Sequence, residues 1–348
     1  MLGDPAWVRE DEMVAKKKLR VKADKAKSKS KKAGWGEKIS RHKGLILFGV
    51  IVYAVLFVAF NYFFFRTDVK KDLQAQVIGQ ITGLGKPCGD FEPEDLAAVG
   101  NDKFVLTDRK IRRILLFSRT GDFLKSIGEA QGNTPQDKVG FADVSANDKG
   151  EITVVDNGSN TIRVYDLAGK NIQNLSLAAM NCYVPRGAYW DGNFFYVADT
   201  GGQKIIKVSS TGEMLEKWGM PGNCKDCFNN VYEVVPDGKG GVYAPDYDNL
   251  RVKHINAAGK VLRIIKMEAR PNNIAVDGQG NLFVASGEGG GFIKVYDPEG
   301  KYKGDLKDAK GQVIFTSPRG MNFAPDGTLL VGQGDTIYLL RIMPIDAK

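Results

Sequence analysis

From residue 70 onward, short runs of alternating apolar and polar residues recur at a nearly constant interval. Runs that end in an acidic or small residue occupy 103–108, 151–156, 194–199, 241–246, 281–286 and 328–333, at intervals of 40 to 48 residues. Each run continues into a turn, a second alternating run, a glycine turn and one more apolar run. Alternation with a period of two is typical of half-buried β-strands. The pattern therefore predicts six copies of a unit built from four short strands.

Repeats of this length with four strands each are typical of propeller blades. The last repeat stops one strand short, while the segment 76–81, ahead of the first full repeat, reads as a strand without a blade. We expect this N-terminal strand to complete the last blade. The predicted fold is an all-β, six-bladed β-propeller over residues 75–342, followed by a short C-terminal tail, 343–348.

Two motifs carry a resemblance to a known family. Pro271-Asn-Asn-Ile-Ala-Val-Asp277 with 280–285, and Val197-Ala-Asp-Thr200 with 204–206, resemble the NHL-repeat β-propellers. The similarity covers residues 75–340. The resemblance implies the fold and leaves several functions open, since such propellers serve as protein scaffolds, RNA-binding platforms or extracellular sensors. Related six-bladed groups include lyases and lactonases.

A different pattern precedes the repeats. Residues 44–65 form a run of twenty-two residues without a charge, bracketed by Arg41 and Lys43 before it and Arg66 after it. About 20 apolar residues cross a bilayer as a helix, so this run predicts a transmembrane helix. The long basic region before it and the aromatic residues at its end favour a retained signal-anchor over a cleaved signal peptide. A short linker, 66–74, then leads into the propeller.

The charge of the chain sets its expected orientation. Residues 1–43 hold fourteen Lys or Arg and six Asp or Glu, which accounts for the whole net charge of +8. This basic segment reads as a disordered tail that stays in the cytoplasm by the positive-inside rule. We expect a single-pass inner-membrane protein with its propeller in the periplasm or another extracytoplasmic space. Because the propeller itself is neutral, a nucleic-acid-binding surface is not expected on it.

The starts of the innermost strands should surround one mouth of the central channel, where propellers commonly bind ligands. Five residues there form the predicted binding face, namely Glu94, Arg186, Tyr232, Asn272 and Arg319. Beside them lie oxygen-bearing residues of the types that hold a divalent ion in lactonase-like propellers: Asp95, Asp143, Glu233 and Asn273. The arginines that share this ring weaken the metal hypothesis, so neither a cofactor nor a metal is expected.

Other chemistry finds little support. The zinc of the related lyases is held by histidines, and the chain has only His42 and His254. The Gly-x-Ser-x-Gly motif of serine hydrolases does not occur in the sequence, so serine hydrolase chemistry finds no support. We therefore expect no catalytic residue, and a membrane-anchored scaffold or accessory subunit that contacts membrane proteins. The alternatives are a sensor for a glycan or peptide and a metal-dependent lactonase or hydrolase.

The four cysteines fall in loops on one side of the propeller. Cys224 and Cys227 form a Cys-x-x-Cys pair that Phe228 excludes from covalent haem attachment, which needs histidine there. An oxidising compartment favours a disulfide. The expected bridge joins Cys182 to Cys224 or Cys227, and Cys224–Cys227 is the local alternative. Cys88 is a further candidate, and a four-thiolate metal site would require it to reach across an intervening blade.

Overall fold

We describe the protein from a computed structural model. Its described residues are 73–82, 93–108, 113–129, 140–287 and 291–343, together with Arg20 and Asp24. Apart from those two, they belong to a compact unit that spans Lys70–Lys348. The predicted membrane anchor 44–65 lies outside the described residues, as do nearly all of the tail and most of the linker. In the part that is described, we find no helix with both the length and the apolar character to span a membrane.

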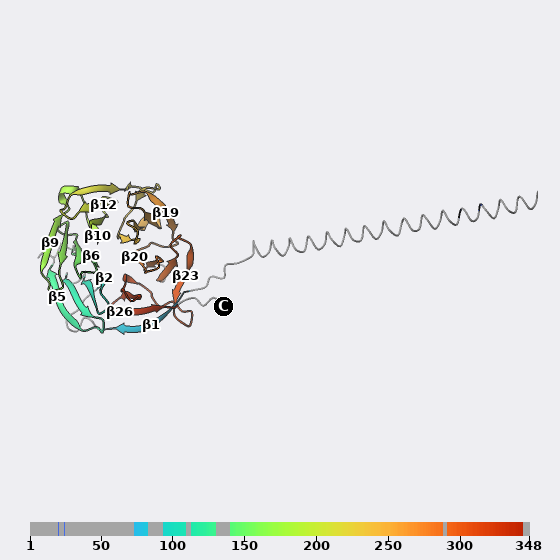
Figure 1. Ribbon diagram of the computed structural model, residues 1–348, viewed down its shortest axis with the longest axis horizontal. Coiled ribbons are helices and arrows are strands. Elements are labelled where there is room, and N and C mark those ends of the chain that lie inside the picture. The colour runs from blue at the N-terminus through green and yellow to red at the C-terminus, as the bar shows by residue number, and fades with distance from the viewer. Residues whose placement is uncertain are drawn as a thin grey trace, which may run out of the picture. The chain divides into compact units, whose positions relative to one another are not determined.

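The described strands form six blades arranged around a centre, and each of the first five blades runs in chain order from its inner to its outer strand (Figure 1). Blades 1 and 2 consist of β2 (Pro93–Val99), β3 (Lys103–Asp108), β4 (Arg113–Ser118) and β5 (Phe123–Glu129), then β6 (Phe141–Ala146), β7 (Ile152–Asp156), β8 (Thr161–Tyr165) and β9 (Asn171–Ser176). Blades 3 and 4 consist of β10 (Pro185–Trp190), β11 (Phe194–Asp199), β12 (Lys204–Ser209) and β13 (Met214–Trp218), then β16 (Val235–Pro236), β17 (Val242–Asp246), β18 (Arg251–Ile255) and β19 (Val261–Lys266). Blade 5 consists of β20 (Asn273–Val276), β21 (Leu282–Ser286), β22 (Phe292–Tyr296) and β23 (Tyr302–Lys307).

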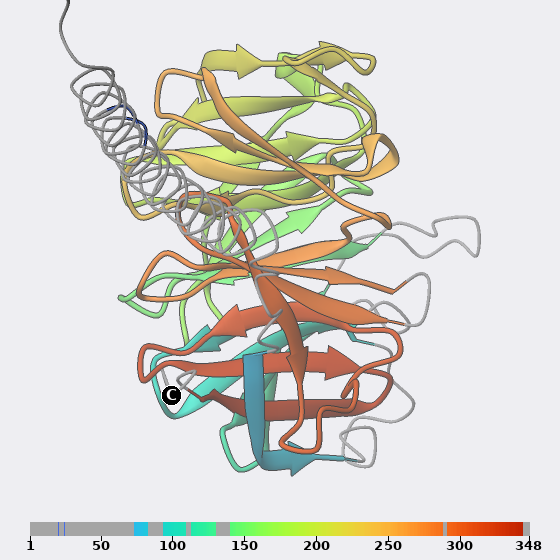
Figure 2. The same cartoon turned by 90° about the vertical axis from the view of Figure 1, so that its right-hand side faces the viewer.

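Blade 6 is closed by the N-terminal strand, as the sequence predicts. It consists of β24 (Arg319–Phe323), β25 (Thr328–Gln333), β26 (Thr336–Ile342) and β1 (Leu73–Ile81), which pairs antiparallel with β26. β1 begins two residues before the predicted propeller boundary. Its first residues also pair in parallel with β23 of blade 5, where Leu73 lies opposite Leu306. β1 therefore joins blades 5 and 6 into one continuous sheet (Figure 2).

The core lies between the blades. Six clusters of buried apolar side chains fill the six interfaces, one for each pair of neighbouring blades. Leu73 and Ala75 contribute to the cluster between blades 5 and 6, and Ile81 contributes to the cluster between blades 6 and 1. Each blade thus buries both of its faces only when the ring is closed, and burial of apolar surface drives that closure. The inner strands are thereby fixed around a central channel.

Small elements in the connections complete the chain. Two 3₁₀ turns are η1 (Ala178–Met180) and η2 (Tyr247–Asn249). A two-stranded parallel pair, β14 (Met220–Pro221) and β15 (Cys227–Phe228), shapes the loop that joins blades 3 and 4. In blade 4 the inner strand is interrupted, since Val231 makes an isolated bridge with Asp246 before β16 begins. This interruption lies next to two residues of the channel mouth, Tyr232 and Glu233.

Candidate functional site at the channel neck

The inner strands bring six equivalent positions to the channel axis. They are occupied by Asp95, Asp143, Gly187, Glu233, Asn273 and Gly320. A cavity of about 640 Å³ opens on the side where the inner strands begin, and all five residues of the predicted binding face line it. A second cavity, of about 480 Å³, opens at the other end of the inner strands. Asp95, Asp143 and Glu233 line both cavities, so they form the neck between them.

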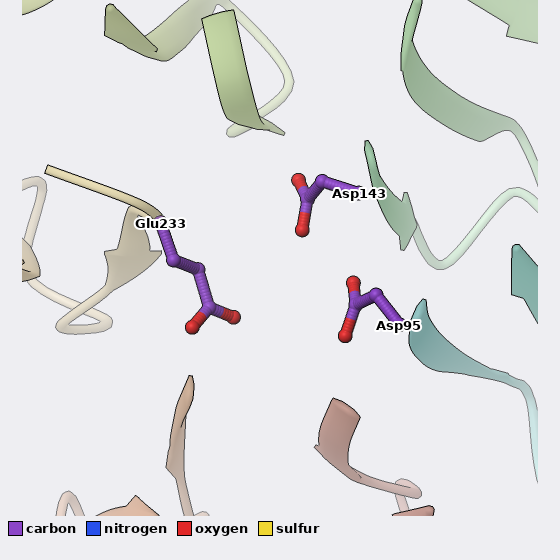
Figure 3. A group of neighbouring side chains, drawn as sticks. All are labelled: Asp95, Asp143 and Glu233. Carbon is purple, nitrogen blue, oxygen red and sulfur yellow. The ribbon is translucent and has the colours of Figure 1, made fainter. Parts of the chain in front are cut away.

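The three neck carboxylates come from three blades and converge (Figure 3). One oxygen from each lies within 4.8 Å of the other two. The residues are only 6% (Asp95), 9% (Asp143) and 8% (Glu233) exposed. Burial of several like charges at such separations is unfavourable unless protons or a cation neutralise them.

Backbone groups of the neighbouring blades hold each carboxylate in place. The N–H of Val144 donates to Asp95 at 3.1 Å, that of Ala188 to Asp143 at 2.8 Å, and that of Ile274 to Glu233 at 2.9 Å. In every case the donor lies on the inner strand of the next blade. These bonds fix the side chains toward the axis and restrict their movement.

The electrostatic setting raises the proton affinity of all three groups. Burial raises the pKa of Asp95 above its ordinary value. Burial, and then the neighbouring charge of Asp95, raise the pKa of Asp143 and of Glu233 well above theirs. Among the described residues, no lysine or arginine forms an ion pair with any of the three. The neck thus gathers three acidic groups that no cationic side chain of the described residues neutralises.

Asn273 adds an amide to this cluster. Its Nδ2 donates to Asp95 Oδ1 at 3.4 Å, while its Oδ1 is buried and has no hydrogen-bond partner. The residue is 8% exposed. A buried acceptor without a donor is costly, and a cation is one group that satisfies it. Three carboxylates and one amide oxygen are the ligand types that hard divalent cations such as Ca²⁺ prefer.

Glycine at the other two axial positions is required by close packing. A Cβ on Gly187 would lie 2.8 Å from the Tyr232 carbonyl oxygen, and one on Gly320 would lie 2.7 Å from the Leu96 amide nitrogen. Both distances are shorter than real Cβ contacts. The neck ring is therefore made of four polar side chains and two glycines that pack against the backbone of the next inner strand.

The mouth above the neck carries two tyrosines in contact with each other, each with an arginine against its ring. The Arg186 guanidinium lies 4.6 Å from the centre of the Tyr232 ring, which meets Tyr247 edge-on at 4.5 Å. Arg270 lies 5.5 Å from the centre of the Tyr247 ring. Such contacts fix the side chains of the mouth wall. Tyr247 and Arg270 were missed from the sequence, because they lie outside the inner strands, on the connections that follow β17 and β19.

The two arginines whose presence in the ring weakened the metal hypothesis both have partners away from the neck carboxylates. Arg319 pairs with Glu94 at 3.3 Å, and Arg186 covers Tyr232. The chain's described histidine, His254, pairs with Asp237 at 2.8 Å and stacks on Tyr243. It lines the second cavity and not the mouth, so a histidine-held zinc at the neck does not fit these residues.

The disulfide prediction needs a correction. The bridge joins Cys224 to Cys227, the local alternative, and the expected bridge from Cys182 is wrong. Cys182 is free and 5% exposed, because it packs in the core between blades 2 and 3. Burial raises the pKa of its thiol. Cys88 lies outside the described residues.

Side chains of β18 in blade 4 form hydrogen bonds with the loop that carries the disulfide. Arg251 donates to the carbonyl oxygens of Cys224 at 2.7 Å and of Cys227 at 2.9 Å. Lys253, which is fully buried, also donates to the carbonyl of Cys227. The disulfide loop is thus anchored to blade 4, and its bridge does not involve the loop that carries Cys182.

Comparisons with known proteins agree on the architecture. A family model described as a 6-bladed beta-propeller matches residues 92–229. A streptogramin B lyase structure is 16% identical, with a TM-score of 0.57, over 78% of this chain and 98% of that one. Virginiamycin B lyase from Staphylococcus aureus is 14% identical, with a TM-score of 0.54, over 78% and 100%. A protein of unknown function from Bacteroides thetaiotaomicron is 16% identical, with a TM-score of 0.57, over 73% and 71%. At these identities the similarity establishes the fold alone: the described residues from 73 to 343 form an all-β, six-bladed β-propeller.

Proposed function

We propose that this chain is a membrane-anchored recognition propeller that binds a divalent cation of the calcium class at the channel neck and a ligand in the mouth above it. The observation that carries the proposal is the cluster of Asp95, Asp143 and Glu233, buried and within 4.8 Å of one another. The unpartnered oxygen of Asn273 supports the same assignment. The anchor and the extracytoplasmic location remain predictions from residues 44–65.

The cost of the cluster argues for a function. Each carboxylate uses one oxygen to accept a backbone N–H, and an amide would accept the same bond without a buried charge. Closure of the ring alone therefore gives no reason for three acids at the neck. Groups whose charge works against folding are commonly found at functional sites. A cation would convert this unfavourable cluster into a favourable one.

Of the three roles that the sequence leaves open, ligand sensing agrees best with this geometry. A scaffold needs only an outer surface, whereas the mouth is a concave cavity with fixed polar walls, which is typical of a ligand site. Docking on neighbouring membrane proteins remains compatible with ligand binding in the channel. A metal-dependent hydrolase would need a proton-transfer group beside the cation, and the geometry singles out none.

Calorimetric titration of calcium into the full-length protein in detergent, after EDTA treatment and dialysis, tests the proposal. We expect one site per chain. Glu233→Gln removes the charge of one of the three carboxylates. It should weaken calcium binding by about a hundredfold or more, since the number of charged ligands sets calcium affinity. Glu213→Gln, at an exposed turn, is the matched control and should bind like the wild type. Absence of binding, or equal binding by Glu233→Gln, would contradict the proposal.

A further inference from the structure

The charges of the mouth indicate what kind of ligand it accepts, provided that the proposed cation binds. The described residues that line the mouth cavity include four acids, Glu94, Asp95, Asp143 and Glu233, and three arginines, Arg186, Arg270 and Arg319. Their formal balance is −1, and a divalent cation changes it to +1. A cavity whose protein walls have a low dielectric concentrates such a field. With the neck acids ionised, the loaded mouth therefore attracts an anion, and the empty one repels it.

One arginine is available to bind that anion. Arg319 is paired with Glu94, and Arg270 is paired with Asp248 at 3.0 Å. Arg186, by contrast, forms no hydrogen bond or ion pair among the described residues, where its contact with the Tyr232 ring positions it. Its guanidinium donors therefore remain free at the cavity wall. A planar guanidinium with free N–H groups is suited to hold a carboxylate by two parallel hydrogen bonds.

A neutral donor also has a place to bind. The side-chain oxygen of Asn272 is buried without a hydrogen-bond partner, while its Nδ2 donates to the Pro318 carbonyl at 3.3 Å. Asn272 itself lines the same cavity as Arg186. Once the Asn272 side chain turns this oxygen into the cavity, a ligand that carries a hydroxyl or an amide N–H near its carboxylate would satisfy it.

We propose that the mouth binds a small carboxylate-bearing ligand, with Arg186 holding the carboxylate and the cation at the neck supplying the positive charge that its binding requires. Two sources carry this chemistry together with a neighbouring donor: an acidic sugar and the C-terminus of a peptide. The coupling is reciprocal, so the ligand strengthens cation binding by the same factor.

The test is calorimetric titration of the full-length protein in detergent, with calcium or with EDTA. The probes are glucuronate and N-acetyl-alanyl-alanine, and their uncharged counterparts are methyl glucoside and N-acetyl-alanyl-alanine amide. Arg186→Gln is the variant, and Lys225→Gln, at an exposed position, is the charge-matched control. Calcium content is measured on every sample.

In the presence of calcium, at least one of the two carboxylate probes should bind, and its uncharged counterpart should not. EDTA should abolish this binding, and Arg186→Gln should weaken it by about ten- to hundredfold while calcium content stays unchanged. Glucuronate binding alone identifies an acidic sugar, and peptide binding alone identifies a C-terminus. Failure of both acids to bind the calcium-loaded protein would overturn the inference, as would equal binding by Arg186→Gln or by the uncharged probes. Loss of calcium from the wild type would instead refute the proposed function.

Discussion

Replacing Asp143 with asparagine should change stability in opposite directions with and without a cation. The asparagine can still accept the N–H of Ala188, now at 2.8 Å from Asp143. Two unit charges 4.8 Å apart, the limit within which the neck oxygens lie, repel by about 3.5 kcal/mol at an effective dielectric of about 20. Protonation already relieves part of this repulsion. We therefore expect Asp143→Asn to stabilise the cation-free protein by about 1–2 kcal/mol.

With calcium present the order should reverse. A cation at 100 times its dissociation constant stabilises the folded wild type by about 2.7 kcal/mol. Asp143→Asn should gain little of this. Thermal melts in EDTA and in calcium measure both effects, at roughly 2–4 °C for each kcal/mol in a domain of this size. The control is Asp148→Asn, an exposed residue of the same blade, which should follow the wild type. A variant that is less stable than the wild type in EDTA would refute the charge-repulsion argument.

Three further predictions concern the framework around the site. Burial lowers the pKa of Lys253 from its ordinary value of 10.5 to about 8, so its charged form is disfavoured in the folded protein. The free energy of unfolding should therefore rise as the pH increases from about 8 toward 10.5. Thermal melts across that range measure this rise, which Lys253→Met should lose. Gly259→Ala should destabilise more than Gly327→Ala in denaturant titrations, because both have a positive φ but only the Cβ at Gly259 would lie 2.2 Å from the Trp218 ring; equal losses would contradict the steric argument. Leu73→Ala should lower the free energy of unfolding by about 2–4 kcal/mol, since this buried residue of β1 packs between blades 5 and 6; a loss below 0.5 kcal/mol would contradict a role for β1 in ring closure.

The fold was predictable because a repeated pattern constrains every blade in the same way. Alternation located the strands, and the missing last strand of the sixth repeat predicted where β1 pairs. The repeat also placed Asp95, Asp143 and Glu233 at equivalent positions, so their approach to one axis could be expected. The repeat could not show that these side chains meet, since their contact depends on how closely the inner strands approach one another, as they do at Gly187 and Gly320.

The remaining features of the site depend on contacts between distant residues. The sequence placed Arg186 and Arg319 in the ring of acids, but a ring position does not reveal that one covers Tyr232 and the other pairs with Glu94. The predicted disulfide from Cys182 was wrong for a similar reason. Loop position put Cys182 and Cys224 on one side of the propeller, whereas packing buries Cys182 in a core between blades.

Anomalous X-ray diffraction from crystals of the protein grown with Mn²⁺, which accepts the same oxygen ligands, tests the central claim most directly. We predict one strong anomalous peak at the channel neck, in contact with oxygens of Asp95, Asp143 and Glu233. Crystals in which those three carboxylates converge without a peak between them, at saturating Mn²⁺ and neutral pH, would contradict the account.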